Sequence, residues 1–170
     1  ALKVVNLLPE KKKILPEIQY TIYRIYLNQG QYFMALFHLN EIIKRAQYTE
    51  AIRETQVRLN VAEVYELMDK RKKALAEYQH VVQIDQDNLQ ANTKLGTILF
   101  QLRNYAAALP YLEKAYELNP DNGEINSCLS EVYYQNGKYE QSIRMVDSAI
   151  SLGQDESGLY LTRGKCKLEL

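Results

Sequence analysis

The amino-acid sequence predicts an all-α protein, a right-handed α-solenoid built from antiparallel helix pairs. Breaks at Thr55, Leu89, Gly123 and Ser157 divide most of the chain into units that each start 34 residues after the previous one. Within each unit, apolar residues recur every three to four positions, as they do on one face of a helix. Short polar breaks with Gly or Pro separate these stretches. A fixed period of this kind indicates one supersecondary unit stacked on the next.

Matching columns of residues justify the helices within each unit. Two such columns are Tyr65, Leu99 and Tyr133, and Ala74, Ala108 and Ser142. The polar turns that contain Gly30 and Gly137 are predicted to separate two helices, because Gly readily takes the left-handed conformation that closes a helix. Pro120 is predicted to end a second helix, since Pro cannot continue a helix interior. Each unit is therefore helix, turn, helix, turn.

At this spacing the residues resemble the tetratricopeptide repeat family, and the resemblance covers nearly the whole chain. The copy that carries it most fully contains Leu95, Gly96, Leu99, Tyr105, Ala108, Leu112, Ala115, Leu118 and Pro120. The resemblance implies four repeats and part of a fifth, at residues 16–54, 55–88, 89–122, 123–156 and, as a truncated first helix, 157–170. Residues 1–15 are expected to hold the end of a preceding helix and a basic linker.

The repeat at 16–54 departs from the family pattern in its length. The next repeat starts 39 residues after Pro16 instead of 34. We expect the second helix of this repeat to absorb the five extra residues by running on through Gln47 to Glu54.

Composition and charge exclude several classes of function. The 21 Lys and Arg residues equal the 21 Asp and Glu residues, so no overall charge draws the chain to nucleic acid or to an anionic membrane. No apolar run approaches the roughly 20 residues that a membrane-spanning helix needs. Cys128 and Cys166 are too few for a disulfide framework and lack zinc-site spacing. We expect an intracellular, reducing compartment, either cytoplasm or nucleus.

Catalytic motifs are not found in the sequence. His38 and His80 are the only histidines, and neither belongs to an HExxH or nucleophile arrangement. The seven glycines are scattered singly, so no phosphate-binding loop is formed. We therefore expect a protein that is not an enzyme and that has no cofactor or metal.

The resemblance implies that the first helices line a concave groove, which would bind a peptide or a helical segment of another protein. We interpret the chain as a scaffold segment within a multiprotein complex, with an internal partner segment anchored by Tyr20, Phe100 and Tyr134. The candidate groove residues are Tyr20, Arg24, Asn60, Glu63, Thr93, Lys94, Thr97, Phe100, Gln101, Glu131, Tyr134 and Gln135.

The main alternative is a co-chaperone adaptor that binds the acidic C-terminus of a heat-shock chaperone. The resemblance would place its carboxylate clamp at Arg24, Asn60 and Lys94. However, Tyr20 and Gln90 stand where two further clamp cations are expected.

A weaker alternative is a nucleic-acid-associated factor. Only the local basic runs 11–13 and 70–73 support this alternative. Self-association through the truncated helix at 157–170 is a further expectation. Its apolar residues Leu159, Leu161 and Leu168 lack a second helix of their own.

Overall fold

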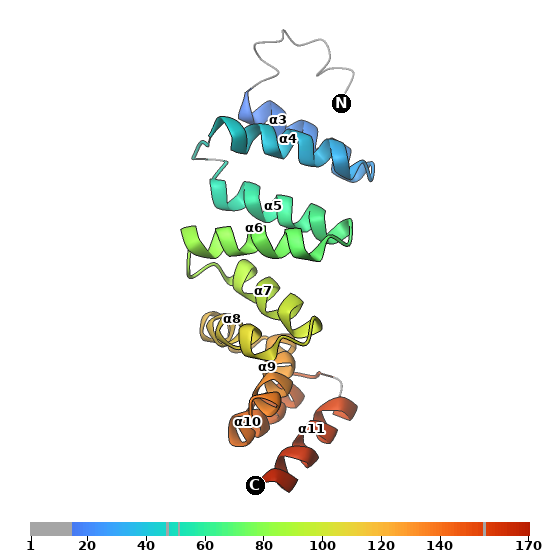
Figure 1. Cartoon of the computed structure of the whole chain (residues 1–170), viewed down its shortest axis with the longest axis vertical. Coiled ribbons are helices and arrows are strands. Elements are labelled where there is room, and N and C mark those ends of the chain that lie inside the picture. Colours follow the sequence, from blue (N-terminus) through green and yellow to red (C-terminus); the bar gives the residue numbers. More distant parts are fainter. Residues whose placement is uncertain (1–14, 47, 51, 155) are drawn as a thin grey trace. The chain divides into compact units, whose positions relative to one another are not determined.

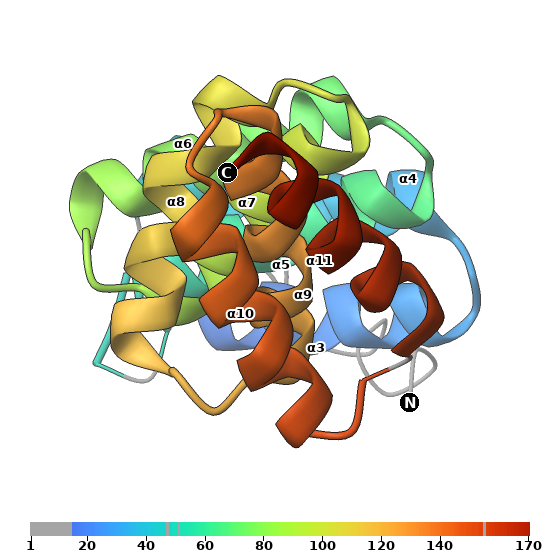
Figure 2. The ribbon, with the colours of Figure 1, turned by 90° about the horizontal axis from the view of Figure 1, so that it is seen from below.

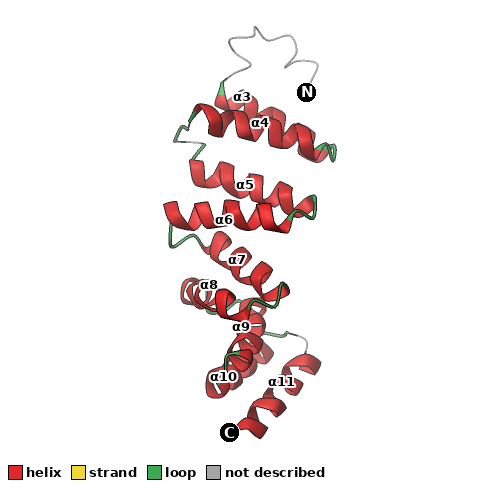
Figure 3. Ribbon diagram, viewed as in Figure 1, coloured by secondary structure: helices red, strands yellow, loops and turns green. Residues whose placement is uncertain are grey.

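The computed structural model describes residues 15–46, 48–50, 52–154 and 156–170. These residues form helices joined by turns and loops, with no strand among them (Figures 1 and 3). The prediction of an all-α fold of helix pairs is confirmed. The chain divides between Asp85 and Gln86 into two compact units, which are described separately below. The helix end and basic linker predicted for residues 1–15 lie outside the described residues, apart from Leu15.

Unit 1 contains two antiparallel helix pairs, α3 (Pro16–Asn28) with α4 (Tyr32–Arg45) and α5 (Glu54–Leu67) with α6 (Arg71–Ile84). Gly30 lies between α3 and α4 at φ 68°, as the sequence predicted for this turn. The corresponding turn between α5 and α6 places Asp69 at φ 53°. Both turns therefore reverse the chain in three residues.

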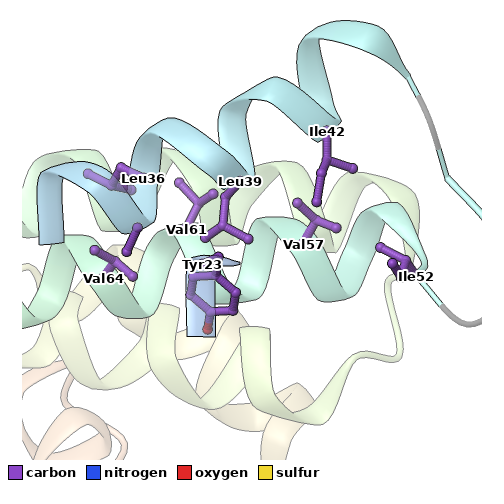
Figure 4. Close-up of a cluster of buried hydrophobic side chains, with 9 residues drawn as sticks. Tyr23, Leu36, Leu39, Ile42, Ile52, Val57, Val61 and Val64 are labelled. Atoms are coloured by element: carbon purple, nitrogen blue, oxygen red, sulfur yellow. The ribbon is translucent and has the colours of Figure 1, made fainter. Parts of the chain in front are cut away.

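The core of unit 1 lies where α4 packs on α5 (Figure 4). Leu36, Leu39 and Ile42 of α4 recur at helical spacing and so project from one side of that helix. They face Val57, Val61 and Val64 of α5 and Tyr23 of α3. Each of these side chains is at most 7% exposed, and burying one contributes roughly 2 kcal/mol.

The predicted extension of the second helix to Glu54 is wrong, because α4 ends at Arg45. Ala46 follows in the left-handed conformation at φ 49°, which stops the helix. Thr49 and Ile52 then bond to each other through both backbone amides at 3.1 Å, and the Thr49 hydroxyl accepts the Ile52 amide as well. This turn carries Ile52 into the core at 5% exposure. Gln47 and Ala51, also in the predicted extension, lie outside the described residues.

Unit 2 contains α7 (Leu89–Gln101) paired with α8 (Tyr105–Leu118), α9 (Gly123–Gln135) paired with α10 (Tyr139–Ser151), and α11 (Glu156–Glu169). Helix α11 packs on α10 and also touches α9 (Figure 2). Gly96 is needed where α7 meets α8, since a Cβ atom there would lie 2.5 Å from Cγ of Leu112. Gly96 therefore allows α7 and α8 to pack closely.

Asparagine side chains fix the starts of three helices in unit 2. Asn88, Asn104 and Asn122 cap α7, α8 and α9 by accepting backbone amides of the first turn. Inside α7, the amide of Asn92 donates to the carbonyl of Gln86 at 2.9 Å, and Asn126 of α9 donates to Pro120 at 3.0 Å. Both bonds reach back six residues, so the loops before α7 and α9 are held in the same way.

Candidate functional site

A pocket of about 330 Å³ opens on unit 2 where the first helices α7, α9 and α11 come together. Helix α7 contributes Phe100, and α9 and α11 each contribute polar and small side chains. The lining residues are Phe100, Ser127, Ser130, Glu131, Gln154, Gly158, Leu159 and Thr162. The pocket thus combines an aromatic ring and a leucine with hydroxyl, amide and carboxylate groups.

Glu131 is the charged group of this pocket, and its carboxylate is held by neighbours on two helices. Thr162 of α11 donates its hydroxyl to Glu131 Oε2 at 3.1 Å, or to the Gly158 carbonyl at 3.2 Å. Gln135 donates to Glu131 Oε1 at 2.7 Å from one turn along α9. Such bonds orient the carboxylate before any ligand arrives, so an incoming donor meets an acceptor already in position.

Aromatic rings on the first helices of unit 2 are supported from the second helices. The ring of Phe100 meets Tyr105 of α8 edge to face at 6.0 Å between centroids. Tyr134 of α9 lies 5.9 Å from Tyr139 of α10, and the ammonium of Lys165 lies 5.7 Å from the Tyr134 ring. Both predicted anchors in unit 2 are half-buried, with one side packed.

The candidate groove residues of unit 1 are partly engaged with one another. Asn60 is only 5% exposed; its amide donates to the Tyr20 hydroxyl at 2.7 Å and accepts from Gln56 at 3.1 Å. Arg24 is exposed, whereas Glu63 is half-buried. Burial beside Tyr20 and Glu63 raises the pKa of the Tyr23 phenol to about 12, so this ring stays neutral in the core.

The remaining candidates lie on α7 and α9. Thr93, Lys94 and Thr97 are half-buried, and Gln101 and Gln135 are exposed. The three proposed clamp residues are divided between the units, Arg24 and Asn60 in unit 1 and Lys94 in unit 2. Asn60 is only 5% exposed and its amide is already bonded to Tyr20 and Gln56, so it presents little surface to a ligand carboxylate.

Sequence reasoning missed the contribution of α11 to the pocket. Gly158, Leu159 and Thr162 come from this helix, and Gln154 from the turn before it. A signal was present, because the 34-residue period gives the helix at 157–170 the same place in its repeat as α9, which already carried candidate groove residues. Extending the repeat columns into the last helix would have found that side of the pocket.

The part of the chain that the structure describes shows no sign of a metal site or a membrane-spanning helix. It contains no group of three His, Cys, Asp or Glu side chains placed to hold a metal ion. None of its helices combines the length and apolar character needed to cross a membrane. Cys166 is buried and donates to the Ser142 hydroxyl at 3.2 Å, and burial raises the pKa of the Cys128 thiol to about 11. The raised pKa means that the Cys128 thiol is not activated as a nucleophile.

Comparison with known proteins identifies the repeat and the fold. Residues 55–88 and residues 99–163 each match a model of the tetratricopeptide repeat. A crystal structure of MamA protein has a TM-score of 0.77 at 18% identity, covering 93% of this chain and 83% of that one. A MamA structure from Desulfovibrio magneticus RS-1 has a TM-score of 0.74 at 18% identity, covering 90% and 84%. Identities this low show a shared fold alone. No curated protein sequence matches the chain.

Proposed function

We propose that this chain, which belongs to the tetratricopeptide repeat family, is a protein-interaction scaffold whose second unit binds an internal segment of a partner protein. The pocket on α7, α9 and α11 is the observation that carries the proposal. It is the kind of concave surface that suits a short stretch of chain, with an apolar anchor point and a few oriented polar groups.

The chemistry of the pocket favours an extended or helical segment over a free carboxylate end. Glu131 supplies a negative charge to the pocket, and Thr162 and Gln135 orient its carboxylate. A backbone amide or a basic side chain of the partner would satisfy this acceptor, whereas a terminal carboxylate would be repelled by it. Phe100 and Leu159 would receive an apolar side chain. A scaffold that captures internal segments fits these groups better than a carboxylate clamp.

Replacing Phe100 by alanine is expected to weaken segment binding by about 30-fold, since truncating an aromatic anchor typically costs on the order of 2 kcal/mol. The ligand would be a peptide selected from a random library on the wild-type chain. Its dissociation constant would then be measured by calorimetry with wild type and Phe100→Ala. Arg144→Ala, on the exposed face of α10, serves as the matched control and should leave affinity unchanged. Selected peptides that bind Phe100→Ala as tightly as wild type would contradict the proposed site.

An acidic peptide ending in Glu-Glu-Val-Asp is expected to bind weakly or not at all. The reason is that Asn60 is occupied, and Tyr20 and Gln90 replace two of the cations that a clamp needs. Titration into wild type and Lys94→Ala, at low and at physiological salt, checks this expectation. If the peptide bound with micromolar affinity, and if Lys94→Ala abolished this binding and salt strongly weakened it, the co-chaperone hypothesis would be supported instead.

A further inference from the structure

The outer face of α4 exposes large apolar side chains away from the core of unit 1. Phe33, Met34 and Phe37 are 73%, 40% and 55% exposed. Phe33 and Phe37 lie one helical turn apart, so their rings are neighbours on the same face. A pocket of about 360 Å³, lined by residues 30–34, opens beside them at the start of the helix. We call this surface, from Gly30 to Phe37, the α4 patch.

The repeat columns show that packing within the array does not require these aromatic residues. With Ala35 aligned on Ala74, Phe33 and Phe37 occupy the columns filled in the other repeats by Lys72, Ala106 and Glu140, and by Ala76, Pro110 and Arg144. All six of these residues are exposed. The two columns therefore face solvent in every repeat, and only this repeat places aromatic rings there.

A stack of aromatic rings connects the α4 patch to helix α3. Phe37 meets His38 edge to face at 5.2 Å, and His38 stacks on Tyr26 of α3 at 5.4 Å. The Nδ1 atom of His38 lies 2.6 Å from the side-chain oxygen of Gln19. Burial lowers the pKa of His38, so the ring beneath Phe37 is neutral at pH 7. The stack holds the aromatic surface in place without adding charge to it.

Among the described residues, the charged groups beside the α4 patch that have no ion-pair partner are positive. The ammonium of Lys70 lies 4.8 Å from the centre of the Phe33 ring. Helices α4 and α6 both begin without a capping side chain or an acidic residue in the first turn, unlike α7, α8 and α9, which Asn residues cap. Helix N-termini carry partial positive charge. The positive ends of both helices are therefore not offset by their own side chains.

A second cation lies at the far end of the same face. Lys44 follows Phe33 by eleven residues, which is about 16 Å along a helix. Glu41 is paired with Arg45 and Asp69 with Arg71. Among the described residues, Lys44 and Lys70 have no carboxylate partner. The aromatic rings are thus bracketed by two cations.

We propose that the α4 patch is a second docking surface, which binds an acidic amphipathic helix of a partner protein. Apolar side chains of that helix would cover Phe33 and Phe37, and carboxylates near its two ends would meet Lys70 and Lys44. A helix about three turns long spans the distance between these cations. This surface lies in unit 1 and the proposed segment pocket in unit 2, so each can be tested without the other.

The test uses two designed helical peptides, each about four turns long and held helical by an internal lactam bridge. Both carry the same leucine stripe, and one has Glu and the other Lys on the flanks. Fluorescence anisotropy would measure their binding to wild type, to the double variant Phe33→Ala/Phe37→Ala, to Lys70→Glu and to Phe100→Ala. Because the substituted residues are exposed or half-buried, circular dichroism should show unchanged helix content in each variant.

The expected result is that wild type binds the Glu peptide at least about tenfold more tightly than the Lys peptide. The double variant should lose about tenfold or more of that affinity, and Lys70→Glu should favour the Lys peptide. Phe100→Ala, in the pocket of unit 2, should leave the affinity for the Glu peptide unchanged. Equal binding of both peptides, or no binding of the Glu peptide at about 1 mM, would overturn the proposal. Binding to anionic lipid vesicles is measured with the same proteins. If the double variant lost vesicle binding but kept its affinity for the Glu peptide, the proposal would also be overturned, in favour of a membrane surface.

Discussion

Replacing Tyr78 by alanine is expected to lower the free energy of unfolding of unit 1 by about 4 kcal/mol, as for other fully buried aromatic residues. Tyr78 lies on α6 with no exposed surface, and its hydroxyl donates to the Glu66 carboxylate at 2.5 Å. The variant therefore removes a whole ring from a packed site and leaves a cavity between α5 and α6. Burial and the bond to Glu66 raise the pKa of Tyr78, so the wild-type phenol is neutral at any ordinary pH.

Native-state hydrogen exchange is the appropriate measurement for this variant, because two compact units need not unfold in one transition. Amides of α6 should lose protection by the expected amount in Tyr78→Ala. Tyr78→Phe removes only the hydroxyl and should cost about 1 kcal/mol. An alanine variant no less protected than the phenylalanine variant would show that the ring does not carry the packing of this pair.

Replacing Gly96 by valine is expected to cost unit 2 roughly 3 kcal/mol through overpacking. A Cβ atom at this position would lie 2.5 Å from Leu112 Cγ and 3.2 Å from the Leu112 backbone nitrogen. Leu112 is fully buried, so its side chain has no space to move into. Valine is also restricted at χ1 in a helix and cannot turn its methyl groups away. Helices α7 and α8 would have to separate.

Gly164→Val in α11 is the matched control, since nothing lies within 4 Å of a Cβ atom built there. Its stability should stay within about 0.5 kcal/mol of wild type, because valine has a slightly better helix propensity than glycine. Chemical denaturation measures the free energy of unfolding of the two variants, and hydrogen exchange measures the protection of the α7 amides in each. Equal stability of Gly96→Val and Gly164→Val would mean that α7 and α8 tolerate a wider spacing than their packing indicates.

The fold was predictable because each helix pair is specified locally and repeated. Polar turns with Gly30 and Gly137 and the stop at Pro120 mark the ends of apolar stretches with helical spacing, and the 34-residue period shows that these stretches stack. The connection after α4 could not be read in this way. Whether five extra residues extend a helix or form a loop depends on tertiary burial of Ile52, which no local pattern of the sequence reveals.

The site was less predictable, because side chains of similar polarity on the first helices have different surroundings. Asn60 and Gln101 both looked like exposed amides of a groove, yet Asn60 is buried against Tyr20 while Gln101 is exposed. The α4 patch was missed in the sequence because apolar residues such as Phe33 and Phe37 are common in any amphipathic helix. Comparing their columns with those of the other repeats would have revealed the anomaly without a structure.

The loop between α4 and α5 shows how an array of this kind can change its length. It spans eight residues, whereas the connections before α7 and α9 span four. Doubling the length of a loop costs only about 0.6 kcal/mol of closure entropy, and burying the Ile52 side chain contributes roughly 2 kcal/mol. An insertion that carries its own apolar residue into the core is therefore close to neutral for stability. Junctions between helix pairs are consequently places where such a gene could gain or lose codons while the helices on either side stay packed.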